Sequence, residues 1–234
     1  MTSWARSEAC LVSEHVTGFI ADYVRFRQVD ISFVVDLWAR AGHMLPALAA
    51  DLGADRSLGF CDGADARRAL VDCHPTMQWS VAEPDSLGGW QLDAPGVVVG
   101  MPPWHWAPRR MSRRTDEGTV VQIADDPANV AIIDACRLLG DRGMGFFIVG
   151  PGFLLRPGSS TAMARLADFG LHIDGVIELP RAAIRPDHGA AQLILALSRN
   201  KQDQPLLGKL SLASNAFTTL LAAQEWFEGA PVLI

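Results

Sequence analysis

Hydrophobic positions along the chain alternate between short continuous runs and longer runs with helical spacing. Residues 31–38 are apolar up to Asp36 and rich in β-branched and aromatic side chains, which is typical of a strand buried on both faces of a parallel sheet. We expect further strands at 56–62, 77–82, 96–100, 144–149, 172–179 and 190–198. Apolar residues recur at helical spacing over 5–27, 44–52, 64–73, 127–139, 160–169 and 213–227. We expect Thr17-Gly18 to interrupt the first of these helices and to divide it into two pieces.

This alternation predicts an α/β fold with a doubly wound, mostly parallel, seven-stranded sheet and helices on both faces. We divide the chain into an N-terminal helical segment (1–29), an α/β domain (30–200) and a C-terminal linker with a helix (201–234). Asp126 and Pro127 are start signals for the helix that follows them. Between the fourth strand and that helix, residues 105–126 are expected to form a polar loop that carries arginines.

Composition adds limits to this picture. The chain has 234 residues, 49% of them hydrophobic, which suits one globular domain without a membrane span or a signal peptide. Four scattered cysteines predict reduced thiols in a cytoplasmic protein. The sequence contains no Cys/His cluster, so we expect no metal site. The net charge of −6 indicates a poor autonomous DNA binder, so DNA binding would require a partner subunit or a further recognition domain.

Two strand ends carry candidate chemistry. Residues 36–42 (DLWARAG) place an acid at the end of a strand and small residues in the following turn, a corner where open α/β sheets bind ligands. An ordinary strand–turn–helix corner has the same pattern. Residues 101–104 (MPPW) end the fourth strand on a rigid Pro-Pro ledge, whose aromatic side chain is either buried or placed to stack on a planar ring.

In this order, the two segments resemble motifs of the adenine-N6 DNA methyltransferases. Residues 36–42 are similar to Asp-Pro-x-x-Gly-x-Gly, and residues 101–104 are similar to Asn-Pro-Pro followed by an aromatic residue. The stretch 128–197 resembles the modification subunit of type I restriction systems, through Leu138-Leu139, Gly143, VGPGFL at 149–154, Arg165 and VIELP at 176–180. The resemblance covers roughly residues 15–199 and implies a Rossmann-like methyltransferase fold with S-adenosylmethionine as cofactor.

The resemblance also implies roles for single residues. Asp36, Ala39 and Gly42 would line the methionine part of the cofactor, and Cys61 or Asp62 would take the place of the acid that binds the ribose hydroxyls. Asp85 would lie near the adenine amino group of the cofactor. Thr17 matches a position that often precedes a helix closing the cofactor pocket. At the substrate side, the resemblance implies a catalytic segment of Met101, Pro102, Pro103 and Trp104, in which Trp104 stacks on the target adenine.

Three departures from the family pattern bear on activity. Arg40 replaces the first glycine of the cofactor motif, where a side chain crowds a closely approaching ligand. Cys61 stands at or beside the position of the ribose-binding acid. Met101 replaces the Asn or Asp that accepts a hydrogen bond from the adenine amino group, and a thioether is only a weak acceptor.

The Pro-Pro ledge is followed by a cluster of four arginines, Arg109, Arg110, Arg113 and Arg114. These side chains are either solvated charges or contacts to a nucleic-acid backbone. Three hypotheses remain open: an adenine-N6 methyltransferase with weakened or lost catalysis, a catalytically silent methylase-like scaffold for a nucleic acid, nucleotide or partner, and a methyltransferase for a non-DNA substrate. Each allows a partner protein or a homo-oligomer.

Overall fold

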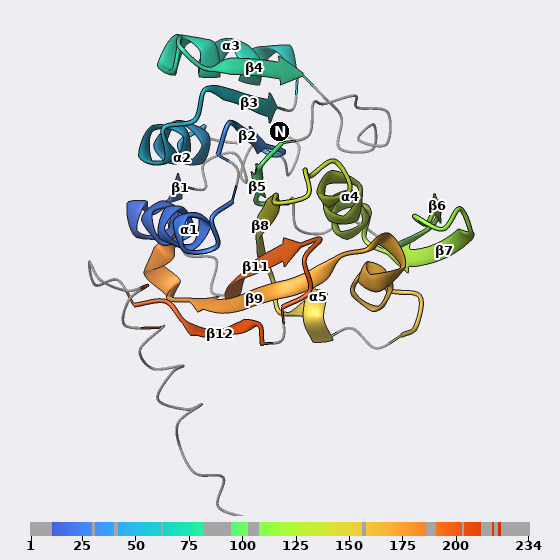
Figure 1. The fold of residues 1–234 in the computed structure, drawn as a ribbon. Coiled ribbons are helices and arrows are strands. Elements are labelled where there is room, and N and C mark those ends of the chain that lie inside the picture. Colours follow the sequence, from blue (N-terminus) through green and yellow to red (C-terminus); the bar gives the residue numbers. More distant parts are fainter. Residues whose placement is uncertain are drawn as a thin grey trace, which may run out of the picture.

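A computed structural model describes residues 11–29, 31–39, 42–61, 63–81, 95–102, 108–155, 158–185, 191–202, 204–211, 217 and 220. Its main sheet has eight strands in the order β12-β9-β11-β8-β5-β2-β3-β4 (Figure 1). These are β2 (Phe33–Asp36), β3 (Arg56–Cys61), β4 (Gln78–Val81), β5 (Val97–Gly100), β8 (Met144–Val149), β9 (His172–Leu179), β11 (Gln192–Ser198) and β12 (Leu206–Lys209).

The sheet is mostly parallel, as predicted. Strands β2, β3, β4, β5 and β8 pair in parallel, β12 pairs in parallel with β9, and β11 runs antiparallel to both of its neighbours. The parallel strands β2 and β5 are buried at every position, as their continuous apolar sequence predicts. The eighth strand, β12, forms in the segment that was expected to be a linker, because its four residues are too few to give a pattern.

Helices cover both faces of the sheet (Figure 1). Helices α1 (Glu14–Phe26), α2 (Met44–Leu52) and α3 (Ala64–Cys73) contribute to one apolar cluster. Helix α4 (Pro127–Cys136), the short α5 (Gly152–Leu155) and the 3-10 helix η3 (Met163–Phe169) contribute to the other. A short 3-10 helix, η4 (Arg181–Ala183), follows β9. In the residues described here, no helix is long and apolar enough to cross a membrane.

Local signals set several boundaries. The Asp126 carboxylate accepts a hydrogen bond from the Ala128 amide at 2.9 Å and caps α4, with Pro127 in the first turn, so this predicted start is confirmed. Helix α1 is one unbroken helix through Thr17 and Gly18, and it is preceded by β1 (Leu11–Val12), which pairs with β10 (Ile184–Arg185). We expected an interruption of the 5–27 helix at Thr17-Gly18, and this expectation is wrong, because α1 runs through both residues. The helix also begins later than expected, since Leu11 and Val12 form a strand, and residues 5–10 lie outside the described residues.

The arginine-bearing segment is a β-hairpin rather than the expected loop. Strand β6 (Arg109–Arg114) pairs antiparallel with β7 (Val120–Asp125). The sequence RRMSRR hides this strand, because only Met111 gives it an apolar position. Met111 packs toward the core cluster that includes α4.

Helix α1 is fastened to the sheet by a buried polar network. The Tyr23 hydroxyl donates to Asp174 Oδ1 at 2.7 Å, and Arg27 Nε donates to the same oxygen at 2.9 Å. A Cβ on Gly175 would lie 2.6 Å from the Tyr23 oxygen, so this approach requires glycine there. Burial, and then the Asp174 charge, raises the pKa of Tyr23 far above its ordinary 10.0, which keeps the hydroxyl protonated.

We predict that Tyr23→Phe lowers the free energy of unfolding by about 1.5–3 kcal/mol, because the buried Asp174 carboxylate loses a donor. Urea unfolding measures this. Lys209→Met is the control: it removes an exposed ion pair with Glu178 and should change stability by about 0.5 kcal/mol or less. Equal effects of the two substitutions would contradict the assigned role of the network.

We also predict that the free energy of unfolding of the wild type falls as pH rises through about 10, because the tyrosine of the unfolded chain loses its proton before the buried Tyr23 does. Tyr23→Phe should lack this pH-dependent loss.

Candidate functional site

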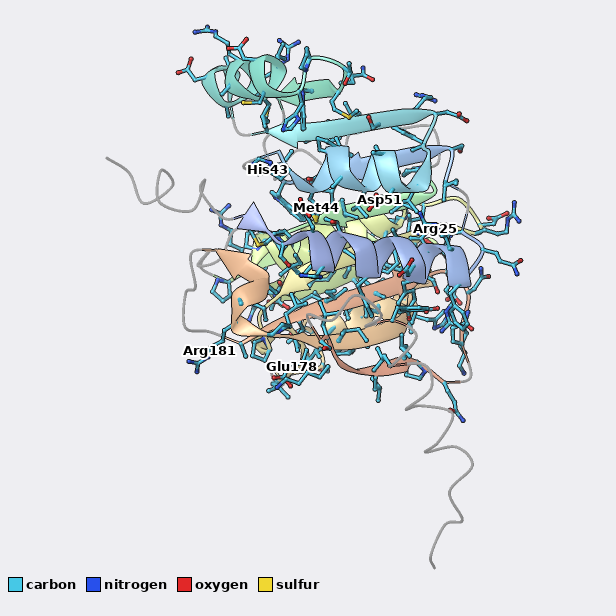
Figure 2. The ribbon with its side chains drawn as sticks, turned by 90° about the vertical axis from the view of Figure 1, so that its left-hand side faces the viewer. Arg25, His43, Met44, Asp51, Glu178 and Arg181 are labelled. Carbon is cyan, nitrogen blue, oxygen red and sulfur yellow. The ribbon has the colours of Figure 1, made fainter. Side chains whose placement is uncertain are left out.

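The candidate site lies where β2, β3 and β5 end. Strand β2 is paired with β3 on one side and β5 on the other, so the chain leaves β2 toward one half of the sheet and later returns to build the other. Ligands of open α/β sheets bind at such a switch point, beyond the carboxyl ends of the strands. In Figure 2, His43 at the start of α2 and Arg181 after β9 lie at this carboxyl edge, and Arg25 lies at the opposite edge.

Asp36 ends β2 and is 2% exposed. Its Oδ1 accepts a hydrogen bond from the Trp38 amide at 3.1 Å, so the carboxylate stabilises the turn that follows the strand. The Ala39 amide donates to the Phe60 carbonyl at 2.8 Å and ties the same turn to β3. Asp36 and Ala39 therefore belong to one turn, their role in lining a cofactor stays a prediction, and Arg40 lies outside the described residues.

Gly42 closes the turn at the start of α2. Its φ is +73°, and a Cβ there would lie 2.2 Å from Leu70 Cδ2 of α3. The positive φ strongly favours glycine at this position, and the contact with the end of the Leu70 side chain adds to this preference. The fold alone thus accounts for Gly42, whatever ligand the turn holds.

At the end of β3, Cys61 is buried and points its thiol at a backbone oxygen. Its Sγ lies 3.3 Å from the Ser80 carbonyl on the neighbouring strand. A thiol that is turned toward the backbone cannot replace a carboxylate that accepts hydrogen bonds from two ribose hydroxyls. The other candidates for acidic contacts, Asp62 and Asp85, lie outside the described residues.

Met101 follows β5 and is 3% exposed. It belongs to the apolar cluster that contains Val99 and Phe146. Pro102 is also buried, whereas Pro103 and Trp104 lie outside the part of the chain that the structure describes. The position that the family resemblance makes catalytic therefore presents an apolar side chain within the core.

Thr17 lies inside α1 rather than before a helix, which corrects the expected placement. It is buried, and its hydroxyl donates to the Glu14 carbonyl at 3.0 Å within the helix. Its predicted role in closing a cofactor pocket stays a prediction.

Trp38 is a residue of this edge that sequence reasoning did not select. Its side chain is 8% exposed and packs on Gly100 at the end of β5. The indole Nε1 is buried without a hydrogen-bond partner in the described structure. The sequence shows an aromatic residue in the turn, but only coordinates reveal that its N–H is unpaired.

The structure divides the arginine cluster. Arg113 faces α4 and forms three short hydrogen bonds to the buried Asp134 carboxylate, at 2.8–2.9 Å. Arg109 also has an interaction partner. Arg110 and Arg114 are exposed, and their alternation places them on the other face of β6 from Arg113. The turn of the hairpin is held by two ion pairs: Asp116 Oδ1 lies 3.6 Å from Arg137 Nε, and Asp116 Oδ2 lies 3.6 Å from Arg199 Nη1.

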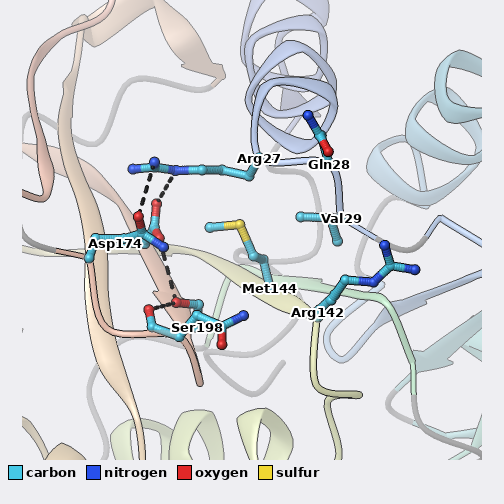
Figure 3. A pocket seen from close by; sticks show the side chains of 10 residues that line it. Arg27, Gln28, Val29, Arg142, Met144, Asp174 and Ser198 are labelled. Carbon is cyan, nitrogen blue, oxygen red and sulfur yellow. Dashed lines mark hydrogen bonds and ion pairs between the residues drawn. The ribbon is translucent and has the colours of Figure 1, made fainter.

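A pocket of about 180 Å³ lies at the opposite edge, where β8 and β9 begin (Figure 3). Its walls include Arg27, Asp174 and Ser198, members of the polar network that fastens α1. The polar network that holds α1 against the sheet therefore explains this pocket without a ligand. In α4, burial raises the pKa of the Cys136 thiol, which keeps it protonated and unreactive. Within the described ranges, no group of three or more His, Cys, Asp or Glu residues is placed to hold a metal ion.

Comparison with solved structures supports the fold assignment. A methyltransferase subunit of a type I restriction–modification system from Streptococcus thermophilus superposes with a TM-score of 0.65 at 14% identity, over 93% of this chain and 52% of that one. A protein from Listeria monocytogenes described as a class I S-adenosylmethionine-dependent methyltransferase gives 0.63 at 17% identity, over 92% and 70%. A protein from Vibrio vulnificus described as a modification subunit of a type I restriction enzyme gives 0.61 at 12% identity, over 95% and 53%.

This chain spans about half the length of the two restriction–modification subunits. A scan against protein-family models found no match, and a search of curated proteins found none either. At these identities the likeness concerns the fold. The chain has the α/β, Rossmann-like fold of the class I S-adenosylmethionine-dependent methyltransferases.

Proposed function

We propose that this chain is an S-adenosylmethionine-binding, adenine-N6 DNA methylase-like domain whose catalysis is weakened or lost. The observation that carries the proposal is Met101, a buried apolar residue at the end of β5 in a methyltransferase fold. Fold and motif order support the cofactor class and the DNA substrate class. Met101 accounts for the reduced chemistry.

The cofactor would bind at the carboxyl edge, where Asp36, Ala39 and Gly42 shape the turn after β2. When bound, S-adenosylmethionine supplies an electrophilic methyl group. The buried, unpaired N–H of Trp38 fits a ligand that carries hydrogen-bond acceptors at this edge. Cys61 offers no carboxylate to the ribose, so we expect moderate rather than tight binding.

Methyl transfer to an adenine amino group needs a polar group that accepts its hydrogen bond as the nitrogen attacks. Met101 has only a thioether, a weak acceptor. Loss of a preorganised polar contact of this kind costs about 3–4 kcal/mol of transition-state stabilisation, or roughly a hundredfold to a thousandfold in rate. A domain with this substitution would still hold cofactor and DNA in a modification complex.

DNA would meet the hairpin through Arg110 and Arg114, not through all four arginines. The hairpin would hold these two cations in fixed positions along β6, and its turn is tied to Arg137 and to Arg199, next to the C-terminal end of β11. With a net charge of −6, the domain would depend on a partner subunit or on a recognition domain for most of its affinity for DNA. We place this complex in the cytoplasm, as part of a restriction–modification type of assembly.

We predict that titration calorimetry gives micromolar dissociation constants for S-adenosylmethionine and S-adenosylhomocysteine. The two ligands share every group that the turn after β2 would contact, so their affinities should be similar. Absence of binding of either ligand up to millimolar concentration would overturn the proposed cofactor site.

We predict that Met101→Asn raises methyl transfer to adenine in DNA by about a hundredfold to a thousandfold, because it restores a strong acceptor at the end of β5. Transfer of a labelled methyl group measures this. The matched control is Met163→Asn, a partly buried methionine of η3, which should bring no gain. Intact cofactor binding without any gain in Met101→Asn would favour a silent scaffold or a non-DNA substrate.

We predict that the double variant Arg110→Glu/Arg114→Glu weakens DNA binding at low salt and reduces the slope of log affinity against log salt by up to about 2, because two phosphate contacts are lost. Filter binding at several salt concentrations measures both quantities. The control Arg25→Glu/Arg68→Glu makes the same charge change on α1 and α3, away from the hairpin. Equal losses in both double variants would assign the effect to net charge alone.

A further inference from the structure

The side chain of Trp38 lies against Gly100, the last residue of β5. A Cβ on Gly100 would lie 2.6 Å from Trp38 Cε3 and 3.0 Å from Cζ3, so the indole occupies room that only glycine leaves free. The contact is made by the benzo edge of the ring. Because Nε1 belongs to the other edge, the N–H lies on the side of the indole away from this contact.

The surroundings fix Trp38 but leave its N–H unpaired. The backbone amide of Trp38 is bound to the Asp36 carboxylate, and the residue is 8% exposed. Nε1 itself is buried and has no acceptor in the structure described. Buried indole N–H groups usually have a partner. Trp79 illustrates this: it is 4% exposed, and its Nε1 donates to the His74 carbonyl at 3.2 Å.

We propose that Trp38 is a ligand-binding residue whose indole N–H donates a hydrogen bond to an oxygen or nitrogen acceptor of bound S-adenosylmethionine. This inference rests on the proposed function and adds a residue to its site. Trp38 lies between Asp36 and Ala39 in the turn that would hold the cofactor. Because Nε1 is closed to solvent, the ligand displaces covering atoms when it binds, and the N–H gains the acceptor that it lacks in the free protein.

The test compares Trp38→Phe with Trp79→Phe in the full chain. Both substitutions keep an aromatic ring and remove one indole N–H. Calorimetry with S-adenosylhomocysteine should show about three- to tenfold weaker binding for Trp38→Phe and unchanged binding for Trp79→Phe. Thermal unfolding without ligand should show the reverse order: both substitutions lower the melting temperature because they remove buried ring atoms, and Trp79→Phe lowers it more because it also breaks a satisfied hydrogen bond.

A second measurement uses the wild-type chain with ¹⁵N-labelled tryptophan. One indole N–H resonance should move downfield when S-adenosylhomocysteine is added, and that resonance should be missing from the spectrum of Trp38→Phe. Trp38→Phe that binds like the wild type, or a Trp38 resonance that does not move at saturating ligand, would overturn this inference alone. A wild-type chain that binds neither cofactor nor product would overturn the proposed function, and this inference with it.

Discussion

The parallel pairing of β2 with β3 on one side and β5 on the other is the constraint on which the candidate site depends. It brings the ends of three strands to one edge and leaves the turn after β2 at the switch point of the sheet. The turn is held from within, since the Asp36 carboxylate accepts the Trp38 amide and Ala39 bonds to β3. Gly42 and Gly100 then allow Leu70 and Trp38 to approach the backbone.

Most residues of the candidate site have a role in the fold, and only a few are left to contact a ligand. Gly42, Cys61 and Arg113 each have a structural partner that explains them without a ligand. Met101 adds an apolar side chain where a methylase needs a strong acceptor. The features left over are the unpaired N–H of Trp38 at the carboxyl edge and the exposed Arg110 of the hairpin; Arg114 is exposed as well, but its Nη1 donates to the Gly118 carbonyl at 2.8 Å. Together they favour a domain that binds more readily than it catalyses.

Most of the fold could be predicted from the sequence, because buried parallel strands are long apolar runs and α4 carries both a capping aspartate and a first-turn proline. The hairpin was missed because its inward face holds Met111 and a paired arginine, not an apolar series. Strand β12 was missed because four residues give no periodicity. At the candidate site, sequence reasoning selected Asp36 and Met101 but not Trp38, because only the structure shows that no acceptor surrounds its N–H.

The most direct test of the central claim is a crystal structure of the chain with S-adenosylhomocysteine. We predict density for the ligand at the carboxyl edge of β2 and β5, against the turn that runs from Asp36 to Gly42, with Trp38 Nε1 within hydrogen-bond distance of a ligand atom. Density at the opposite edge, in the pocket beside Arg27 and Asp174, or crystals grown with saturating ligand that show none at the turn, would contradict the account.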